Sequence, residues 1–186
     1  MPAFIPCSPV MLLPETLPAV KILHFNGAPR RDTVYAYARI SACGDALHCS
    51  FLRFEEAPAA SVRMALAITS ADCTNAFALV SVSFAGQASF DYYETGKEPQ
   101  NMPIAAPHVY KGTDEQGFYN GADCTVPLDT LAKLLDKAFV PGAVFAGNVY
   151  SYDITEAAFG AAFAVPISER IPTAAGFEAF TCVSFE

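Results

Sequence analysis

Two β-rich segments joined by a Gly-Asp pair constrain the fold of this chain more than any other feature. Residues Val34–Ile40 read VYAYARI, and residues Leu47–Glu55 read LHCSFLRFE. Both segments are rich in the β-branched and aromatic residues that favour strands. Gly44-Asp45 between them is typical of a two-residue hairpin turn. The sequence therefore predicts an antiparallel β-hairpin.

Seven further segments have the composition or the alternation of strands. In FALVSVSF, for example, Val80 and Val82 point to one face and Ser81 and Ser83 to the other. The seven are Val62–Thr69, Phe77–Phe84, Ala88–Glu94, Gly117–Pro127, Ala143–Ile154, Phe159–Ile167 and Phe177–Phe185. We therefore expect an all-β fold, an antiparallel β-sandwich of about nine strands with one short helix.

The one predicted helix covers Leu128–Phe139, LDTLAKLLDKAF, in which leucines recur at helical spacing. Pro127 suits a helix start, and Pro141-Gly142 stops it. No strand–helix–strand alternation accompanies it, which argues against a parallel α/β fold.

A chain of 186 residues, 53% of them hydrophobic, fits one domain with one core. We expect residues 1–31 to form an N-terminal extension with a first strand that packs on the domain, and residues 32–186 to form the β-sandwich. The segment between Thr95 and Gln116 has no sustained period, so it is predicted to be a long loop.

The net charge of −8 excludes the most common nucleic-acid-binding surface, because no Lys/Arg cluster exceeds Arg30-Arg31. No apolar run approaches the ~18 residues that span a membrane. The N-terminus has no basic region ahead of its proline-interrupted apolar residues. We therefore expect a cytoplasmic protein, or an extracellular one if a signal peptide has been removed ahead of Met1.

The six cysteines form no C-x-x-C motif and do not pair with the three histidines, so a zinc site has little support. The hairpin turn would place Ile40 opposite Cys49, and Cys43 opposite Ala46. This register keeps the sulfurs of Cys43 and Cys49 apart. The interpretation is six reduced, mostly buried thiols.

Four stretches follow one another along the chain: ALHCSFLRFEEAP, FALVSVSFAGQASFDYYE, ADCTVPLDTL, and GNVYSYDI with FGAAFAVP. Taken in this order, they resemble family 9 carbohydrate-binding modules and the wider DOMON-like β-sandwich group. The resemblance covers about Asp32 to Glu186. It implies a β-sandwich that binds a small saccharide without catalysis, and it allows a structural calcium ion. No other cofactor is expected.

The chain contains no tryptophan, whereas the family holds sugar between tryptophan rings. Tyrosine would have to stack on the sugar instead, because a phenol ring offers an apolar face and a polar tip. Arg53 is a further candidate, since a guanidinium suits vicinal oxygens, and Asn148 can donate and accept to a diol. The predicted ligand-binding residues are Arg53, Tyr92, Tyr93, Tyr110, Tyr119, Asn148 and Tyr150.

Glu55 and Glu56 do not qualify as a catalytic acid/base pair. Adjacent strand residues project to opposite faces, whereas glycosidase carboxylates face each other across the bond they cleave. Pairing of Arg53 with Glu55 is the structural alternative to ligand binding by Arg53.

Three functions remain open at this stage. The first is a non-catalytic saccharide binder, and the second is an interaction or assembly domain that has lost sugar binding. The third and weakest is an enzyme that uses His108 in the Thr95–Gln116 segment, since no common catalytic motif is present. We expect neither a nucleic acid nor a membrane as partner, and the sequence sets no oligomeric state.

Overall fold

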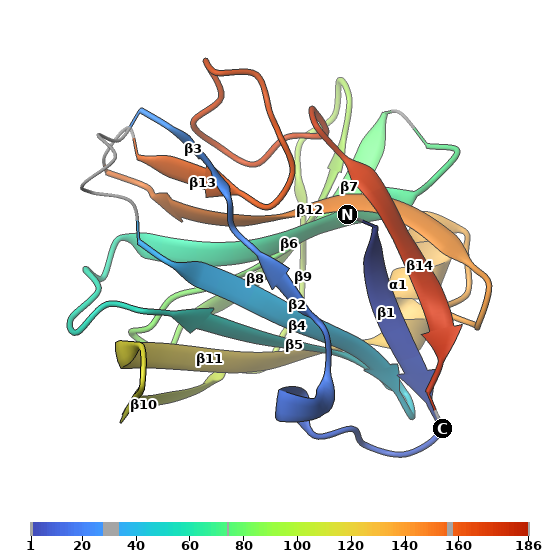
Figure 1. Ribbon diagram of the computed structural model, residues 1–186. Helices are drawn as coiled ribbons and strands as arrows, with labels where there is room; N and C mark the ends of the chain where they lie inside the picture. The colour runs from blue at the N-terminus through green and yellow to red at the C-terminus, as the bar shows by residue number, and fades with distance from the viewer. Residues whose placement is uncertain (1, 28–33, 74, 156–157, 186) are drawn as a thin grey trace.

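The computed structural model describes residues 2–27, 34–73, 75–155 and 158–185 (Figure 1). The described residues form fourteen strands, one α-helix, α1 (Leu128–Leu135), and one 3₁₀ turn, η1 (Pro14–Thr16). The strands are β1 (Ala3–Ser8), β2 (Ala19–Lys21), β3 (His24–Asn26), β4 (Ala36–Cys43), β5 (Ala46–Arg53), β6 (Val62–Ser70), β7 (Ala76–Val82), β8 (Ala88–Glu94), β9 (Gln100–Met102), β10 (His108–Asp114), β11 (Gly117–Pro127), β12 (Val144–Asp153), β13 (Phe159–Ala161) and β14 (Glu178–Ser184).

The strands form one continuous mixed sheet that folds over on itself into two layers (Figure 1). Its strand order is β10-β11-β5-β4-β1-β14-β12-β6-β7-β8-β9, with β2 added to β4, and β13 to β12 and β3. The first layer contains β10, β11, β5 and β4, and the second contains β12 and β6 to β9. Strands β1 and β14 join the two layers at one side.

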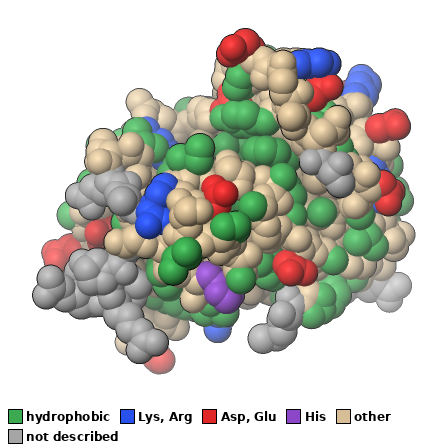
Figure 2. Space-filling view, turned by 90° about the horizontal axis from the view of Figure 1, so that it is seen from above, with side chains coloured by type: hydrophobic (Ala, Val, Ile, Leu, Met, Phe, Trp, Pro, Cys, Tyr) green, Lys and Arg blue, Asp and Glu red, His purple; other side chains and the backbone are tan. Residues whose placement is uncertain are grey.

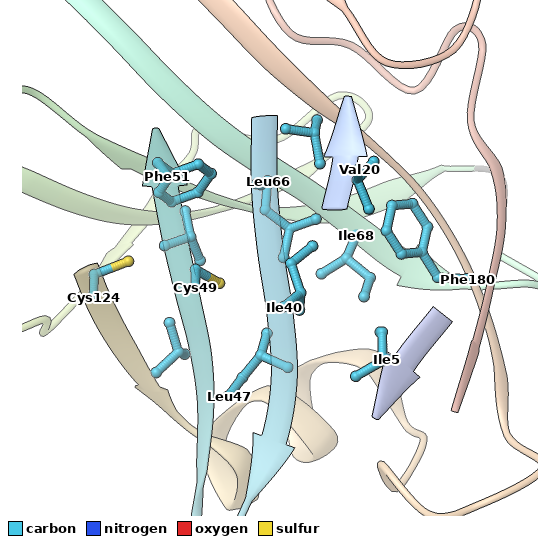
Figure 3. Close-up of a cluster of buried hydrophobic side chains, with 14 of the residues drawn as sticks. Ile5, Val20, Ile40, Leu47, Cys49, Phe51, Leu66, Ile68, Cys124 and Phe180 are labelled. Carbon is cyan, nitrogen blue, oxygen red and sulfur yellow. The ribbon is translucent and has the colours of Figure 1, made fainter. Parts of the chain in front are cut away.

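The core lies between the layers and is built by strand alternation (Figure 3). Ile40 and Phe51 point inward from the first layer and meet Leu66 and Ile68 of β6 from the second. Phe180 of β14 closes the same cluster. Each such side chain contributes roughly 1.5–3 kcal/mol when fully buried.

The predicted hairpin is confirmed, register included. Ile40 lies opposite Cys49, and Cys43 lies opposite Ala46. Gly44 in the turn has φ +59°, in the left-handed region where most side chains are strained, so the turn favours glycine there.

The prediction of about nine antiparallel strands is wrong in number and only partly right in orientation. Strand β1 runs parallel to both neighbours, with Ile5 opposite Cys182 and Cys7 opposite Ala42. Because its pairing partners β14 and β4 lie far away along the chain, no local sequence pattern indicates that β1 is parallel to them. The segment predicted as a loop between Thr95 and Gln116 contains β9 and β10, two strands without a strongly hydrophobic face.

The helix is shorter than predicted. It begins at Leu128 as expected but ends at Leu135 instead of Phe139. Asp136 adopts a left-handed conformation with φ 49°, which ends a helix just as a glycine at that position would. Leu131 and Leu135 are buried against the core.

The N-terminal residues are integrated into the sandwich. Strands β1 to β3 pair with β4, β14 and β13. The expected boundary near residue 31 lies outside the described residues. Within the described ranges, no helix has both the length and the apolar character needed to cross a membrane. On the face seen in Figure 2, the described Lys and Arg side chains are isolated and form no basic stripe.

The prediction that most cysteines are buried is confirmed: all but Cys73 are buried, and Cys73 is half-buried. Contact with the Cys124 thiol, together with burial, raises the pKa of Cys49 well above its usual range. Burial and the neighbouring Cys7 raise the pKa of Cys182 to about 12. At Cys73, burial alone would raise the pKa, but hydrogen bonds from Asn75 and Thr69 outweigh it and lower the pKa.

We expect Cys73 to be the one thiol of the native protein that reacts quickly with an aromatic disulfide reagent at pH 8, because the thiolate is the nucleophile. Absorbance of the released thiolate should show one fast equivalent, and six after denaturation. Cys73→Ala should abolish the fast phase. Two or more fast equivalents from the native protein would contradict the packing described above.

We expect Phe51→Ala to lower the free energy of unfolding by about 3–5 kcal/mol, because it leaves a cavity in a fully buried site. Phe118→Ala is the matched control: this ring is 54% exposed, and its loss should cost less than about 0.5 kcal/mol. Urea unfolding of both variants measures the difference. Equal costs would show that Phe51 does not belong to the core.

Candidate functional site

A polar row crosses the outer face of the first layer, from β4 to β10. Arg39 lies opposite Ser50, Ser50 lies opposite Asp123, and Asp123 lies opposite His108. Directly opposed residues in an antiparallel ladder project to the same face. The intervening residues, such as Ile40, point into the core. Four neighbouring strands therefore present four hydrogen-bonding side chains side by side.

A pocket of about 450 Å³ lies over this row. Its polar floor includes Arg39, Ser50 and Asp123, together with Ser41, His48 and Thr125 from the adjacent row. One wall is apolar and consists of Met11, Leu12, Leu13, Pro14 and Leu17. Ala105, Ala106 and His108 line the opposite side.

The apolar wall exists because of how the chain attaches to β4. Ser8 of β1 pairs with Cys43, and Ala19 of β2 pairs with Arg39, on the same edge of β4. The two attachment points are four residues apart along β4 (43 − 39), whereas ten residues (9–18) connect them. Four strand residues span only about 13 Å. The surplus chain must bulge out, and η1, flanked by Leu13 and Leu17, lies beside the face of the sheet.

Arg39 places a guanidinium group in the lining of this pocket. Its guanidinium lies 4.9 Å over the Tyr37 ring, and its Nε is buried without a hydrogen-bond partner. Within the described part of the chain, its guanidinium makes no ion pair. A buried donor without a partner costs free energy, and arginine cannot remove the cost by losing its proton. Nε therefore marks a position where a ligand oxygen would be favourable.

The carboxylate of Asp123 accepts a hydrogen bond from the phenol of Tyr110. Tyr110 Oη donates to Asp123 Oδ1 at 3.2 Å and lies 3.4 Å from Ser50 Oγ. Burial, with a smaller contribution from the Asp123 carboxylate, raises the pKa of Tyr110 to about 12. The phenol therefore stays protonated and remains a donor at neutral pH. The His108 ring stacks on Tyr110 with centroids 5.6 Å apart.

An aromatic cluster adjoins the pocket on the same face. The Tyr37 ring, which supports Arg39, lies near Tyr35 and Phe54, and Phe54 lies 6.0 Å from Tyr119. All four rings are half-buried, so each keeps part of its surface open.

Two glycines let tyrosines lie across the strands of β10 and β11. Tyr110 lies opposite Gly121, and Tyr119 lies opposite Gly112. A Cβ at either glycine would overlap the tyrosine ring opposite it. Each ring therefore covers its partner glycine and rests on the face of the sheet, close to the backbone.

The structure brings together two of the seven predicted site residues, Tyr110 and Tyr119, on one face. Tyr92 and Tyr93 lie on β8 in the other layer; Tyr92 packs against the core, and Tyr93 stacks on Phe77 at 5.1 Å. They do not approach the pocket.

Asn148 and Tyr150 on β12 are fully buried, with exposures of 0%. The Asn148 amide donates to the carbonyls of Phe163 and Gly176, and the Tyr150 hydroxyl donates to that of Thr173. These polar groups anchor the segment that follows β13. The hydrogen bonds of Asn148 and Tyr150 to backbone carbonyls therefore stabilise the fold.

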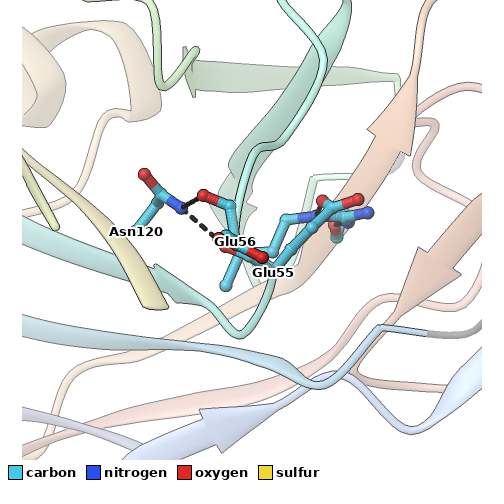
Figure 4. A network of polar contacts seen from close by, with 5 residues as sticks. Glu55, Glu56 and Asn120 are labelled. Atoms are coloured by element: carbon cyan, nitrogen blue, oxygen red, sulfur yellow. Dashed lines mark hydrogen bonds and ion pairs between the residues drawn. The ribbon is translucent and has the colours of Figure 1, made fainter. Parts of the chain in front are cut away.

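Arg53 points to the inner side of β5 near its end and forms an ion pair with Glu55, with Nε and Oε2 2.6 Å apart. Its Nη1 also donates to Ser151 Oγ at 2.6 Å. Asn120 Nδ2 donates to the carbonyls of Glu55 and Glu56 (Figure 4). The pairing of Arg53 with Glu55, the structural alternative to ligand binding by Arg53, is therefore present, and the backbone carbonyls of Glu55 and Glu56 belong to the same network.

Sequence reasoning did not select Arg39, Ser50 or Asp123. The alternation of β4 and β5 places Arg39 and Ser50 on the outer face, and that signal was present. The signal that Asp123 joins them was absent, because β11 follows β5 by more than sixty residues. Within the described ranges, no three His, Cys, Asp or Glu side chains gather in a way that could hold a metal ion.

No protein-family model and no curated protein sequence matches the chain. The solved structures that match the chain include three that align over nearly its whole length. One is a candidate carbohydrate-binding protein from Bacteroides uniformis, with 10% identity and a TM-score of 0.65 over 96% of this chain and 97% of that one. The other two are family 9 carbohydrate-binding modules, whose fold this chain shares.

Both modules are from Caldicellulosiruptor kristjanssonii. The module in complex with glucose has 6% identity and a TM-score of 0.56, over 100% of this chain and 97% of that one. The module in complex with cellotriose has 8% identity and a TM-score of 0.51, over 98% of this chain and 95% of that one. The fold expected from the resemblance is thus confirmed.

We expect Gly121→Ala to destabilise the protein by about 1–3 kcal/mol, because the added methyl group overlaps the Tyr110 ring. Tyr110→Ala should remove the overlap. The double variant should therefore be more stable than the two single costs predict, with a coupling of roughly 0.5–3 kcal/mol by urea unfolding. Additive costs would show that Tyr110 does not lie over Gly121.

Proposed function

We propose that this chain is a non-catalytic domain that binds a small saccharide on the outer face of β10, β11, β5 and β4. The observation that carries the proposal is the unpartnered Arg39 Nε, which lies in a pocket beside tyrosine rings. The fold supports it, because the neighbours of the same fold include modules in complex with glucose and cellotriose.

Aromatic and polar groups on this face have complementary tasks. The rings of Tyr110 and Tyr119, with Tyr37 beside them, offer apolar surface to the C–H face of a pyranose, which replaces the missing tryptophan. Arg39 donates to hydroxyl oxygens, and Asp123 accepts from hydroxyl groups. Ser50 can do both. A pocket of about 450 Å³ has room for a sugar ring or two.

The absence of catalysis is part of the proposal. Ser50 and His48 share the floor of the pocket, but the hydrogen-bond partner found for Ser50 Oγ is Tyr110. A serine nucleophile needs a base within hydrogen-bond reach. The site is therefore arranged for binding through side chains that the fold holds in place.

An interaction or assembly domain is the second candidate, and one observation favours it. Met11 and Leu13 beside the pocket are 69% and 62% exposed, which is unusual for large apolar side chains grouped at one place. Sedimentation velocity over a hundredfold range of protein concentration tests this candidate. A constant monomer would count against self-assembly.

Calorimetric titration with mono- and disaccharides, with and without calcium, tests saccharide binding. Tyr119→Ala should weaken the affinity by roughly 3–10-fold, because one stacking ring is lost. Tyr93→Ala, in the opposite layer, is the matched control and should change the affinity less than about twofold. Absence of binding to any saccharide, or an equal effect of both variants, would refute the proposed site.

A further inference from the structure

Arg39 differs from the other described arginines in how its guanidinium is satisfied. Arg53 pairs with Glu55, Arg63 donates to the carbonyls of Ala60 and Val62, and Arg170 donates to two carbonyls. For Arg39, no hydrogen bond or ion pair with the described part of the chain is found, although its Nε is buried. Among the described residues, the fold supplies a cation here without a paired counter-charge.

The surroundings of Arg39 do not neutralise it. Asp123, the one carboxylate in the pocket lining, is separated from it in the row by Ser50 and is engaged by Tyr110. Two histidines, His48 and His108, face the same pocket, and neither can supply a negative charge. Glu15 on η1 is exposed.

The guanidinium is also held in a defined place. Tyr37 supports one face of it at 4.9 Å, and the apolar wall from Met11 to Leu17 borders the same pocket. An apolar border lowers the local dielectric and strengthens an ionic contact. A hydroxyl would satisfy a donor but leave the charge unpaired, whereas a carboxylate satisfies both and accepts two parallel hydrogen bonds.

We infer that the ligand of this pocket is an acidic saccharide, a sugar acid whose carboxylate pairs with Arg39. This inference rests on the proposed function and narrows its ligand class. The hydroxyl groups of the sugar then face Ser50 and Asp123, and the ring lies toward Tyr110.

Calorimetry with sodium glucuronate, the neutral methyl ester of glucuronic acid, and glucose, at one ionic strength, tests the inference. Glucuronate should bind at least about tenfold more tightly than the ester or glucose, because only it forms the charge-assisted pair. Equal affinities for the three would overturn the inference and leave the proposed function standing. No binding of any of them would overturn both.

Two variants and one simple acid locate the selectivity. Arg39→Gln should abolish the preference for glucuronate over its methyl ester, and Arg63→Gln, the matched control on β6, should retain it. Circular dichroism checks that each variant is folded. If Arg39→Gln does not fold, the affinities of the wild-type protein for glucuronate, its methyl ester and glucose test the inference on their own. An unchanged preference in folded Arg39→Gln would overturn the inference, and so would propionate binding as tightly as glucuronate.

Discussion

The parallel pairing of β1 with β14 and β4 is the contact on which the rest of the structure depends. It joins residues 3–7 to residues 180–184, and residues 7 and 8 to residues 42 and 43. These pairs close almost the whole chain into a loop and make two layers into one sheet. They also fix one end of residues 9–18, and the pairing of β2 with β4 fixes the other. The apolar wall of the pocket is the chain left over between these two points.

Two arginines show how position on a strand decides what a charge does. Arg53 lies on the inner side of β5, where burial is tolerated only because Glu55 and Ser151 satisfy it. Arg39 lies on the outer face of β4, where Tyr37 supports it and its Nε stays without a partner. The first stabilises a strand end, and the second is available to a ligand.

Local patterns predicted much of the fold. The hairpin register follows from one turn, and Ala88–Glu94 and Gly117–Pro127 are strands with the predicted bounds. Strand β1 was missed as a parallel strand because both partners are distant in sequence. Strands β9 and β10 were missed because their side chains are mostly exposed and supply no hydrophobic period.

The candidate site was predictable only in part, for the same reason. Tyr110 and Tyr119 were selected as rings with polar tips, but alternation cannot say which strands lie side by side. The row from Arg39 to His108 requires β4, β5, β11 and β10 to be neighbours in that order. Conversely, the sequence predicts Asn148 and Tyr150 as ligand-binding residues, but in the structure their side chains donate hydrogen bonds to backbone carbonyls.

The most direct measurement is the two-dimensional ¹⁵N spectrum of the labelled protein during titration with a saccharide ligand, including the Nε–H region of arginine. We expect the Arg39 Nε–H resonance and the backbone amide resonances of Ser50 and Asp123 to shift together with one dissociation constant, whereas the amide resonances of β7 and β8 stay in place. Shifts centred on Tyr92, Tyr93 or Asn148, with Arg39 unchanged, would contradict the proposed site.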